Sequence, residues 1–470
     1  MKIGSSTASI PNPTPLLFLI TATALLLWPD APGLTALIVA AAVMAPIAVF
    51  CLSYSAVGAI IALIVASAVP RLYVEIAGLK ARPEHIICGV LCISILFLKR
   101  QRRRPVQWIW PDYLLMIYAA LNIFSSWFMS IAPSQTIKWA VQQVLVILAY
   151  FFLRVLVEDR NGLRKAFMVL LSVGSATVAF GILCFYSNLI LGTEVGVTLG
   201  QYGDIPATQG LQFEANILGS YSGALAVMML VTYLYGRRRR FLAGFALAFA
   251  GMAISLSRGA VGATLIGLLV VAFFSVRKRF LTRKLLFSVV KATLCALLLV
   301  LPAVLSQYTE RFSTVDISDP TADPNTLTRV VQVGSAFEEV LKHPVLGGGT
   351  SSFQLAFDWQ SLGAEWEDQG WIANTEMRVL HDTGLIGLVV FSAFLVSLYR
   401  RSRKVLKFES NPELVALLAS TVVYCIAFQA TEGTLLAFTW VHLGLIGCAI
   451  SGFSAPKTSY ERGLDQTASG

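Results

Sequence analysis

The stretch RRRRFLAGFALAFAGMAISLSRGAVGATLIGLLVVAFFSVRKR, residues 237–279, decides the fold. Two apolar runs, 241–257 and 259–276, lie between clusters of Arg and Lys. Each run is close to the ~20 residues that a helix needs to cross a bilayer. Basic clusters are typical of loops on the cytoplasmic side of a membrane. The stretch therefore predicts a helical pair that leaves the cytoplasm and returns, with Arg258 at the turn on the outer side.

The same pattern repeats along the chain. Of its 470 residues, 56% are hydrophobic and only 13% are charged, and the mean hydropathy is +0.72. Soluble domains carry about 25% charged residues. We therefore expect an all-α polytopic membrane protein with about 12–14 transmembrane helices. The expected spans are 15–29, 34–52, 54–70, 85–98, 109–130, 137–157, 166–192, 215–235, 241–257, 259–276, 285–306, 377–399, 412–430 and 434–453.

The net charge of +10 is distributed as in a membrane protein and not as in a nucleic-acid-binding protein. Clusters such as KRQRRR (99–104) and RRSRK (400–404) lie between apolar runs, which places both termini in the cytoplasm. The first run, Pro15–Trp28, has no A-x-A-like cleavage site followed by a soluble domain, so we expect a span there. The seven cysteines lie in or beside apolar runs, and we expect neither a metal site nor another cofactor.

One hydrophilic segment is far longer than the other loops. The predicted organisation is 1–307 with about eleven spans, an extracytoplasmic loop at 308–375, C-terminal spans at 376–455 and a cytoplasmic tail at 456–470. Long insertions among tight loops are commonly functional. The long loop is therefore the first place to look for a site.

The motif HPVLGGGTSSF, residues 343–353, lies within that loop. Helical spacing of apolar residues predicts a helix over 330–341, and Pro344 would end it close to His343. The backbone N–H groups of three glycines could bind an anion. Alternatively, the glycines form a tight turn that ends the helix. The three are Gly347, Gly348 and Gly349.

Three arginines on the predicted outer side could bind phosphate. Arg258 has no acidic residue near it within 241–276, so it is either a bidentate phosphate clamp or an arginine that snorkels to the interface. Arg329 and Arg311 could each be a second phosphate ligand or a surface charge.

Two further segments carry groups that could move a proton. In ANTEMRVLHDTGLIGL (373–388), Glu376 or His381 could be a general base, or Asn374 could simply cap a helix. In TQGLQFEANILGSY (208–221), Glu214 and Asn216 could take a proton or bind a sugar hydroxyl. A plain helix cap explains that pair equally well.

The order of these motifs resembles the O-antigen ligase/O-antigen polymerase (Wzy-type) superfamily of bacterial membrane glycosyltransferases. The matching segments are GLQFEAN (210–216), SRGA (257–260), HPVLGGG (343–349) and GLIG (384–387), within about residues 200–395. The resemblance implies an all-helical, GT-C-like fold with a large outward loop over a cavity. It also implies inverting transfer of a glycan from undecaprenyl diphosphate, with no nucleotide sugar and no required metal.

Site residues follow from the resemblance position by position. Arg258 and Arg329 match arginines that hold the lipid diphosphate, and Asn374 matches the Asn of a His-Asn pair. The His of that pair falls at Ala373, which favours a polymerase over a ligase. Gln209 stands where the family often has an arginine.

The function expected from the sequence is polymerisation of undecaprenyl-diphosphate-linked oligosaccharide at the outer face of the bacterial inner membrane. The alternatives are a ligase that transfers the glycan to lipid A-core, a transporter or flippase, and a binding or scaffold protein whose site has decayed. The expected partners are the lipid-linked donor, a glycan acceptor, the bilayer, and chain-length or export proteins. Nucleic acid is not expected.

Overall fold

The computed structural model describes residues 56–76, 79–98, 106–198, 207–277, 282–313, 324–357, 372–409 and 411–451. The expected spans at 15–29 and 34–52 lie outside them. The elements are α3 (Ala56–Ser67), β1 (Val74–Ile76), β2 (Leu79–Ala81), α4 (Pro83–Leu98), α5 (Trp110–Phe128), α6 (Pro133–Leu156), α7 (Arg160–Leu191), α8 (Ala215–Gly236), α9 (Arg239–Ile254), α10 (Arg258–Arg277), α11 (Arg283–Ser313), α12 (Pro324–Lys342), α13 (Phe353–Ala356), α14 (Thr375–Phe408), α15 (Pro412–Ala427) and α16 (Ala437–Ile450).

The chain is an all-α polytopic membrane protein, as the hydropathy pattern predicts. Every expected span from 54–70 onward coincides with a helix. Within the described ranges, α6, α7, α8, α10, α11 and α14 are long and apolar enough to cross a membrane. The strands β1 and β2 pair antiparallel, with Glu75 opposite Lys80, and form a short hairpin before α4.

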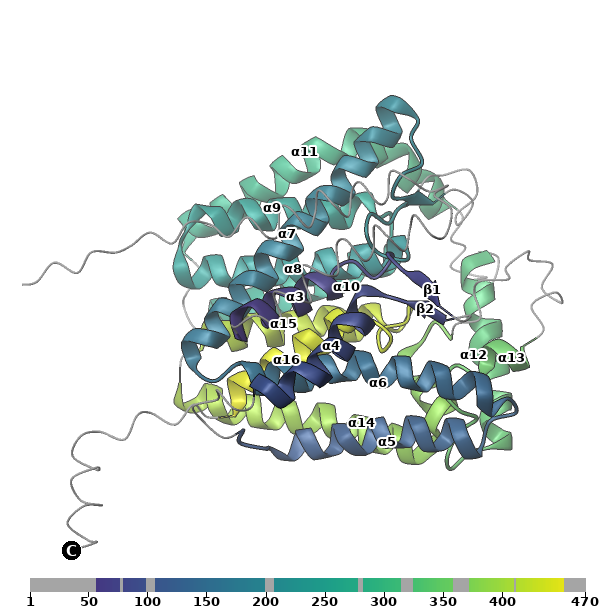
Figure 1. The fold of residues 1–470 in the computed structure, drawn as a ribbon. Helices are drawn as coiled ribbons and strands as arrows, with labels where there is room; N and C mark the ends of the chain where they lie inside the picture. The colour runs from purple at the N-terminus through teal and green to yellow at the C-terminus, as the bar shows by residue number, and fades with distance from the viewer. Residues whose placement is uncertain are drawn as a thin grey trace, which may run out of the picture.

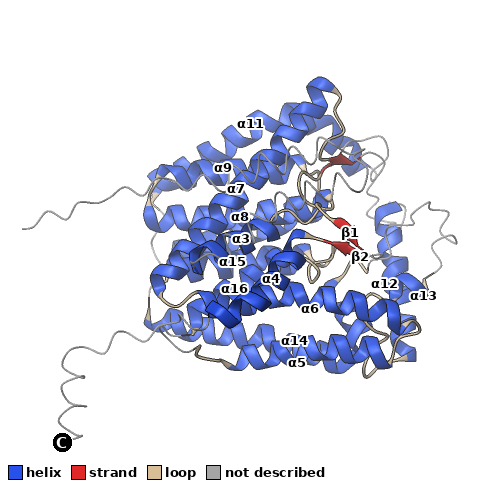
Figure 2. Cartoon of the chain, viewed as in Figure 1, coloured by secondary structure: helices blue, strands red, loops and turns tan. Residues whose placement is uncertain are grey.

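Helix α8 lies at the centre of the bundle and α11 at its edge. Nearly all residues of α8 are buried, because α7, α9, α10 and α15 pack around it. Leucines of α11 such as Leu298 are largely exposed, as expected for a helix that faces lipid. Figure 1 and Figure 2 show the long helices running side by side, with β1, β2, α12 and α13 at one end of the bundle.

Two glycines allow α8 and α10 to pack closely. A Cβ at Gly219 would lie 2.7 Å from the Cβ of Ala260, and one at Gly223 would overlap Thr264. This is the small-xxx-small packing typical of membrane helices. The contact brings the first turn of α10, with Arg258, close to the first turn of α8.

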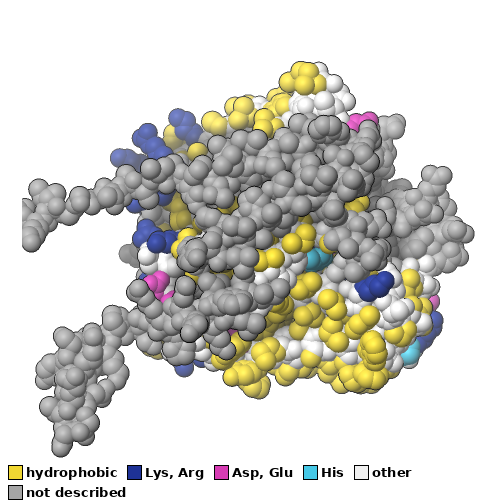
Figure 3. Space-filling view, in the orientation of Figure 1, with side chains coloured by type: hydrophobic (Ala, Val, Ile, Leu, Met, Phe, Trp, Pro, Cys, Tyr) yellow, Lys and Arg dark blue, Asp and Glu magenta, His cyan; other side chains and the backbone are white. Residues whose placement is uncertain are grey.

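The long segment between α11 and α14 contains two helices. The helix expected over 330–341 is present as α12, and it ends at Lys342, two residues before Pro344. Helix α11 continues to Ser313, which is beyond the expected start of the loop at 308. On the face shown in Figure 3, Lys and Arg gather mainly at the opposite end of the bundle from α12.

Candidate functional site

Helix α14 is broken at Gly384, where the backbone has φ 66° and ψ −169°. In a continuous helix, residues 385 and 386 would donate to the carbonyls four residues earlier. Instead, the N–H of Leu385 donates to the Pro344 carbonyl at 2.9 Å, and the N–H of Ile386 donates to the Val345 carbonyl at 3.2 Å. The HPVLGGG segment therefore supplies the carbonyl acceptors that an unbroken helix would provide to residues 385 and 386.

The glycines complete this exchange. The His381 and Asp382 carbonyls, released by the break, accept hydrogen bonds from Gly348 N–H at 2.8 Å and Gly349 N–H at 3.1 Å. Gly347 has φ 73°, and a Cβ there would lie 2.5 Å from the His381 carbonyl oxygen. Only glycine fits so close a backbone contact.

The anion-cradle interpretation of the three glycines is therefore wrong, because all three N–H groups donate to backbone carbonyls. Gly347 N–H donates to the carbonyl of His343 at 2.9 Å, which closes the turn after α12. The tight-turn interpretation is confirmed. His343 itself is half-buried, and its backbone carbonyl accepts the hydrogen bond that closes this turn.

The same loop is fastened to α5. Thr350 N–H donates to Ser126 Oγ at 2.8 Å, and the Thr350 hydroxyl donates to Asn122 Oδ1 at 3.1 Å. Ser125 Oγ donates to the Asp382 carbonyl at 2.8 Å. Three segments far apart in the sequence are thus held at one point beside the break in α14.

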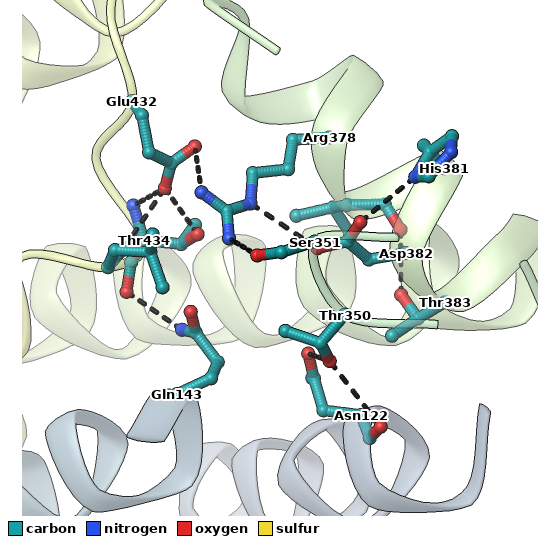
Figure 4. Close-up of polar contacts among 12 residues, drawn as sticks. Asn122, Gln143, Thr350, Ser351, Arg378, His381, Asp382, Thr383, Glu432 and Thr434 are labelled. Carbon is teal, nitrogen blue, oxygen red and sulfur yellow. Dashed lines mark hydrogen bonds and ion pairs between the residues drawn. The ribbon is translucent and has the colours of Figure 1, made fainter. Parts of the chain in front are cut away.

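A buried network of charges centres on Arg378, six residues before the break (Figure 4). Its Nε lies 3.3 Å from Asp382 Oδ2, and its Nη1 lies 3.2 Å from Glu432 Oε2. Its Nη2 donates to Ser351 Oγ at 2.8 Å. One guanidinium therefore joins α14, the loop of residues 343–353 (the glycine loop) and the α15–α16 connection.

His381 lies at the edge of this network. Its Nδ1 lies 3.0 Å from Asp382 Oδ1, and its ring packs edge-on against Phe353 with centroids 5.6 Å apart. The side chain is 2% exposed. The ring thus contacts both the loop and the helix that the loop stabilises.

The connection between α15 and α16, residues 428–436, forms the other wall of the site. Glu432 accepts hydrogen bonds from the N–H and hydroxyl of Thr434 and, at 3.0 Å, from Leu435 N–H. Gln143 of α6 donates to the Thr434 carbonyl at 2.8 Å. Glu432 is thereby held in place to meet Arg378.

Glu214, which was selected from the sequence, lies at this connection and interacts electrostatically with Arg329. Glu214 stands immediately before α8, is half-buried, and bonds through its side chain to Thr431. Burial raises the pKa of the Glu214 carboxyl, and the positive charge of Arg329 acts in the opposite direction. Glu432 raises that pKa further. Glu214 makes no side-chain cap bond, so the plain helix-cap interpretation does not account for it.

Arg258 approaches the same connection from α10. It is half-buried in the first turn, and Ser257 Oγ accepts a hydrogen bond from Ala260 N–H at 3.2 Å, which caps the helix. A Cβ at the next residue, Gly259, would lie 3.7 Å from the Cβ of Ala430. Arg258 is therefore placed near the 428–436 connection.

Asn374 and Glu376 form a more exposed cluster. Asn374 caps α14 by accepting from Met377 N–H at 2.8 Å, so the capping interpretation is confirmed. Its amide also donates to Gln429 Oε1 at 2.9 Å. Gln429 in turn donates to Glu376 Oε1 at 2.8 Å. Glu376 is thus exposed and already held by an amide.

The remaining predicted residues are less central. Asn216 is half-buried in the first turn of α8, where its carbonyl accepts from Ser220 Oγ at 2.7 Å. Arg311 belongs to the last turn of α11, but its side chain lies outside the described residues. The described residues hold no group of three or more His, Cys, Asp or Glu that could bind a metal ion.

Sequence reasoning did not identify Arg82, a further arginine at this end of the bundle. Arg82 lies 3.3 Å from Glu84, donates to the Leu435 carbonyl at 3.2 Å, and stacks over the ring of Phe213 at 5.3 Å. It thus joins the start of α4 to the segments that carry Glu214 and Glu432. The only sequence signal was the segment RPEH (82–85), whose charged residues stand at the start of a short apolar run.

Gln209, which departs from the family pattern, also has an arginine beside it. With its amide oxygen turned toward Arg71, Gln209 accepts from both terminal nitrogens of Arg71 at 3.2 Å. Arg71 also donates to the Gly210 carbonyl at 3.3 Å. A guanidinium is therefore present at this corner, although the chain lacks an arginine at position 209.

A comparison with protein families matches part of the chain. A family model described as O-antigen ligase matches residues 243–392, which cover α10, α12, the glycine loop and the break in α14. No curated protein sequence matches the chain. Over this region, about a third of its length, the chain is similar to the O-antigen ligase family.

Proposed function

We propose that the protein transfers a glycan from a polyprenyl-diphosphate donor to a sugar hydroxyl, with inversion, and that it acts as a polymerase at the outer face of the bacterial inner membrane. The observation that carries the proposal is the convergence of Arg258, Arg329 and Glu214 around the 428–436 connection. A diphosphate leaving group gains negative charge as the glycosidic bond breaks, and cations placed around it lower that barrier.

Glu214 is the proposed general base. Its raised pKa gives the carboxylate a higher proton affinity than an ordinary glutamate, and a base is most effective when its pKa is near the working pH. Arg329 supplies a positive charge nearby, where the diphosphate would lie. In contrast, His381 is buried against Phe353, and Glu376 is held by Gln429.

Ala373 supports polymerase over ligase activity, since the resemblance assigns the ligase base to this position. The side chain of Ala373 cannot accept a proton. The ligase remains the second candidate because the matching family model is described as O-antigen ligase.

The test uses purified full-length protein in lipid nanodiscs with an undecaprenyl-diphosphate oligosaccharide. Lengthened lipid-linked glycan is the expected product. Arg258→Ala and Arg329→Ala should each lower the rate by at least about 100-fold, the scale seen when one group that stabilises developing negative charge is removed. Arg400→Ala, an exposed residue of α14, is the matched control and should leave the rate unchanged.

Each other outcome has a defined meaning. Full lengthening by both arginine variants would refute the diphosphate site. Transfer to lipid A-core without lengthening would assign a ligase. Appearance of unreacted lipid-linked glycan in the opposite leaflet would assign a flippase.

A further inference from the structure

Helix α12 carries four of its large apolar residues on the side that faces away from the protein. Four large apolar side chains on this helix are between 44% and 64% exposed. On the opposite side, Gln332 is buried and Arg329 is half-buried toward the site. A surface helix of a water-soluble domain has the reverse arrangement. The four exposed residues, here called the apolar stripe, are Leu327, Val330, Phe337 and Leu341.

The stripe is a true helical face. Its members are separated by three, seven and four residues, which places them one above another along the helix. Gly334 lies within the stripe and is exposed, and exposed Glu338 lies at its edge. The buried side carries Ala336 and Val340.

The apolar stripe continues onto an exposed apolar surface of α14. Four residues beyond Leu341, Val345 is 56% exposed, and its carbonyl accepts the N–H of Ile386 at 3.2 Å. Leu385 and Ile386 are exposed on α14, which is long and apolar enough to span the membrane. In Figure 3, hydrophobic side chains cover the lower part of the molecule, where Figure 1 places α5 and α14.

The direction of α12 fits the same surface. Figure 1 shows α12 running across the axes of α5, α6 and α14, at the end of the bundle where α5 ends and α6 begins. A helix that crosses the axes of spanning helices lies along the membrane plane, as interfacial amphipathic helices do. Lys342, exposed at the end of α12, is suitably placed for lipid phosphate groups.

We propose that α12 is an interfacial membrane helix whose apolar stripe rests on bilayer lipid at the headgroup boundary. Its opposite side, which carries Gln332 and Arg329 as well as Ala336 and Val340, then turns toward the bundle and holds Arg329 beside Glu214. The lipid anchors the helix from one side, and the glycine loop fixes its end from the other. This proposal does not depend on which glycan the protein transfers.

The test places a photoreactive residue on each side of α12 in the full-length protein. Phe337→p-benzoylphenylalanine lies on the apolar stripe, and Glu339→p-benzoylphenylalanine lies on the half-buried side as the matched control. Both are irradiated in nanodiscs of phosphatidylethanolamine and phosphatidylglycerol, and adducts are identified by mass spectrometry. We expect lipid adducts at position 337 to exceed those at 339 several-fold.

Three results would overturn the proposal: crosslinks from position 337 to residues 358–371 of the same chain, crosslinks to a second copy, or equal lipid adducts at both positions. A second measurement needs no variant. The unmodified protein is placed in nanodiscs that contain a phosphatidylcholine with a diazirine on its acyl chain. Labelling of the peptide that spans 324–342 is expected, and its absence alongside a labelled α14 would also overturn the proposal.

Discussion

Two buried ion networks lie at opposite ends of α5, and they differ in how completely their polar atoms are paired. At the start of α5, Asp112 Oδ2 accepts from Arg154 Nη2 at 2.9 Å and from Ile109 N–H at 2.9 Å. Asp112 Oδ1 accepts from Tyr150 at 2.7 Å, and Arg154 Nη2 also donates to the Gln107 carbonyl at 2.6 Å. This inner network joins α5, α6 and the segment just before α5. Among the described residues, none of its buried polar atoms lacks a hydrogen bond.

The outer network, about 20 Å of helix away by the 1.5 Å rise per residue, is centred on Arg378. Arg378 Nη1 and Glu432 Oε2 face each other at 3.2 Å, yet neither makes a hydrogen bond within the described part of the chain. Both carboxylate oxygens of Glu84, beside Arg82, also make no hydrogen bond within the described residues. Buried polar atoms without hydrogen bonds are uncommon.

We propose that the inner network is structural and that the outer network serves the function. The inner network satisfies one acid and one base with local partners and needs nothing more. The outer network joins α14, the glycine loop and the 428–436 connection, beside Glu214, Arg329 and Arg258. A site that binds a charged substrate has polar atoms that can pair with that substrate. A structural support does not need such atoms.

The largest effect on stability is expected for Arg154→Ala, which breaks the inner network. It leaves the Asp112 carboxylate buried without a counter-charge, which costs about 3–5 kcal/mol. The measurements are the yield of monodisperse protein after extraction and the melting temperature. Arg160→Ala is the control, because Arg160 and Glu409 form only an exposed pair at 3.8 Å. Equal yields from the two variants would show that the inner network does not support the fold.

Arg378→Ala should lower the melting temperature, because it removes the counter-charge of both Asp382 and Glu432, and should also abolish turnover. Asp382 keeps its contact with His381, and Glu432 keeps its donors from Thr434 and Leu435, so neither carboxylate loses all its partners. Arg378→Lys keeps the charge but not the fork that meets Ser351, and should restore melting temperature more than rate. Glycan lengthening by Arg378→Ala at the native rate would contradict a functional outer network.

Gly384→Ala tests the break that places the outer network. At φ 66° and ψ −169° a non-glycine residue is strained, at a cost of about 1–3 kcal/mol, and the added Cβ would overlap the Val345 backbone. Lower melting temperature and loss of turnover are expected together. Gly334→Ala, with no atom near its added Cβ, is the matched control and should lower neither the melting temperature nor the rate.

Hydropathy predicted the helices because lipid contact depends on composition over a window of residues. It could not predict the break in α14, since Gly384 lies in a segment whose composition suits an uninterrupted span. The break exists because the HPVLGGG segment supplies replacement hydrogen bonds from about forty residues earlier.

The site residues likewise show that local sequence patterns do not predict contacts between distant segments. Arg258 and Glu214 were identifiable because each is a charge beside an apolar run, and Arg329 was identifiable because it matches an arginine of the family pattern. The pairing of Arg378 with Glu432 was not, because those residues are far apart in the sequence and no local pattern relates them. Arg82 was overlooked for the same reason, since its partners at Phe213 and Leu435 lie in other segments.

The smallest effect on stability is expected for Glu214→Gln, which separates function from fold most sharply. Because its pKa is raised in the folded state, the carboxyl favours folding below its unfolded pKa, and that contribution is lost as pH rises through the folded pKa. Removing the ionisable group at neutral pH should therefore leave the melting temperature unchanged or slightly higher. The rate should nevertheless fall by about 100-fold or more, the scale of a lost general base.

The pH dependence makes this prediction specific to a base. In the native protein the glycan-lengthening rate should rise with pH, with a midpoint above the ordinary glutamate value of 4.5, as Glu214 loses its proton. Glu214→Gln should remove that rise, whereas Glu376→Gln, at an exposed residue, should keep it. If the rise persists in Glu214→Gln and disappears in Glu376→Gln, the base belongs to the exposed Asn374–Gln429 cluster. The raised pKa of Glu214 would then reflect only its burial beside the outer network.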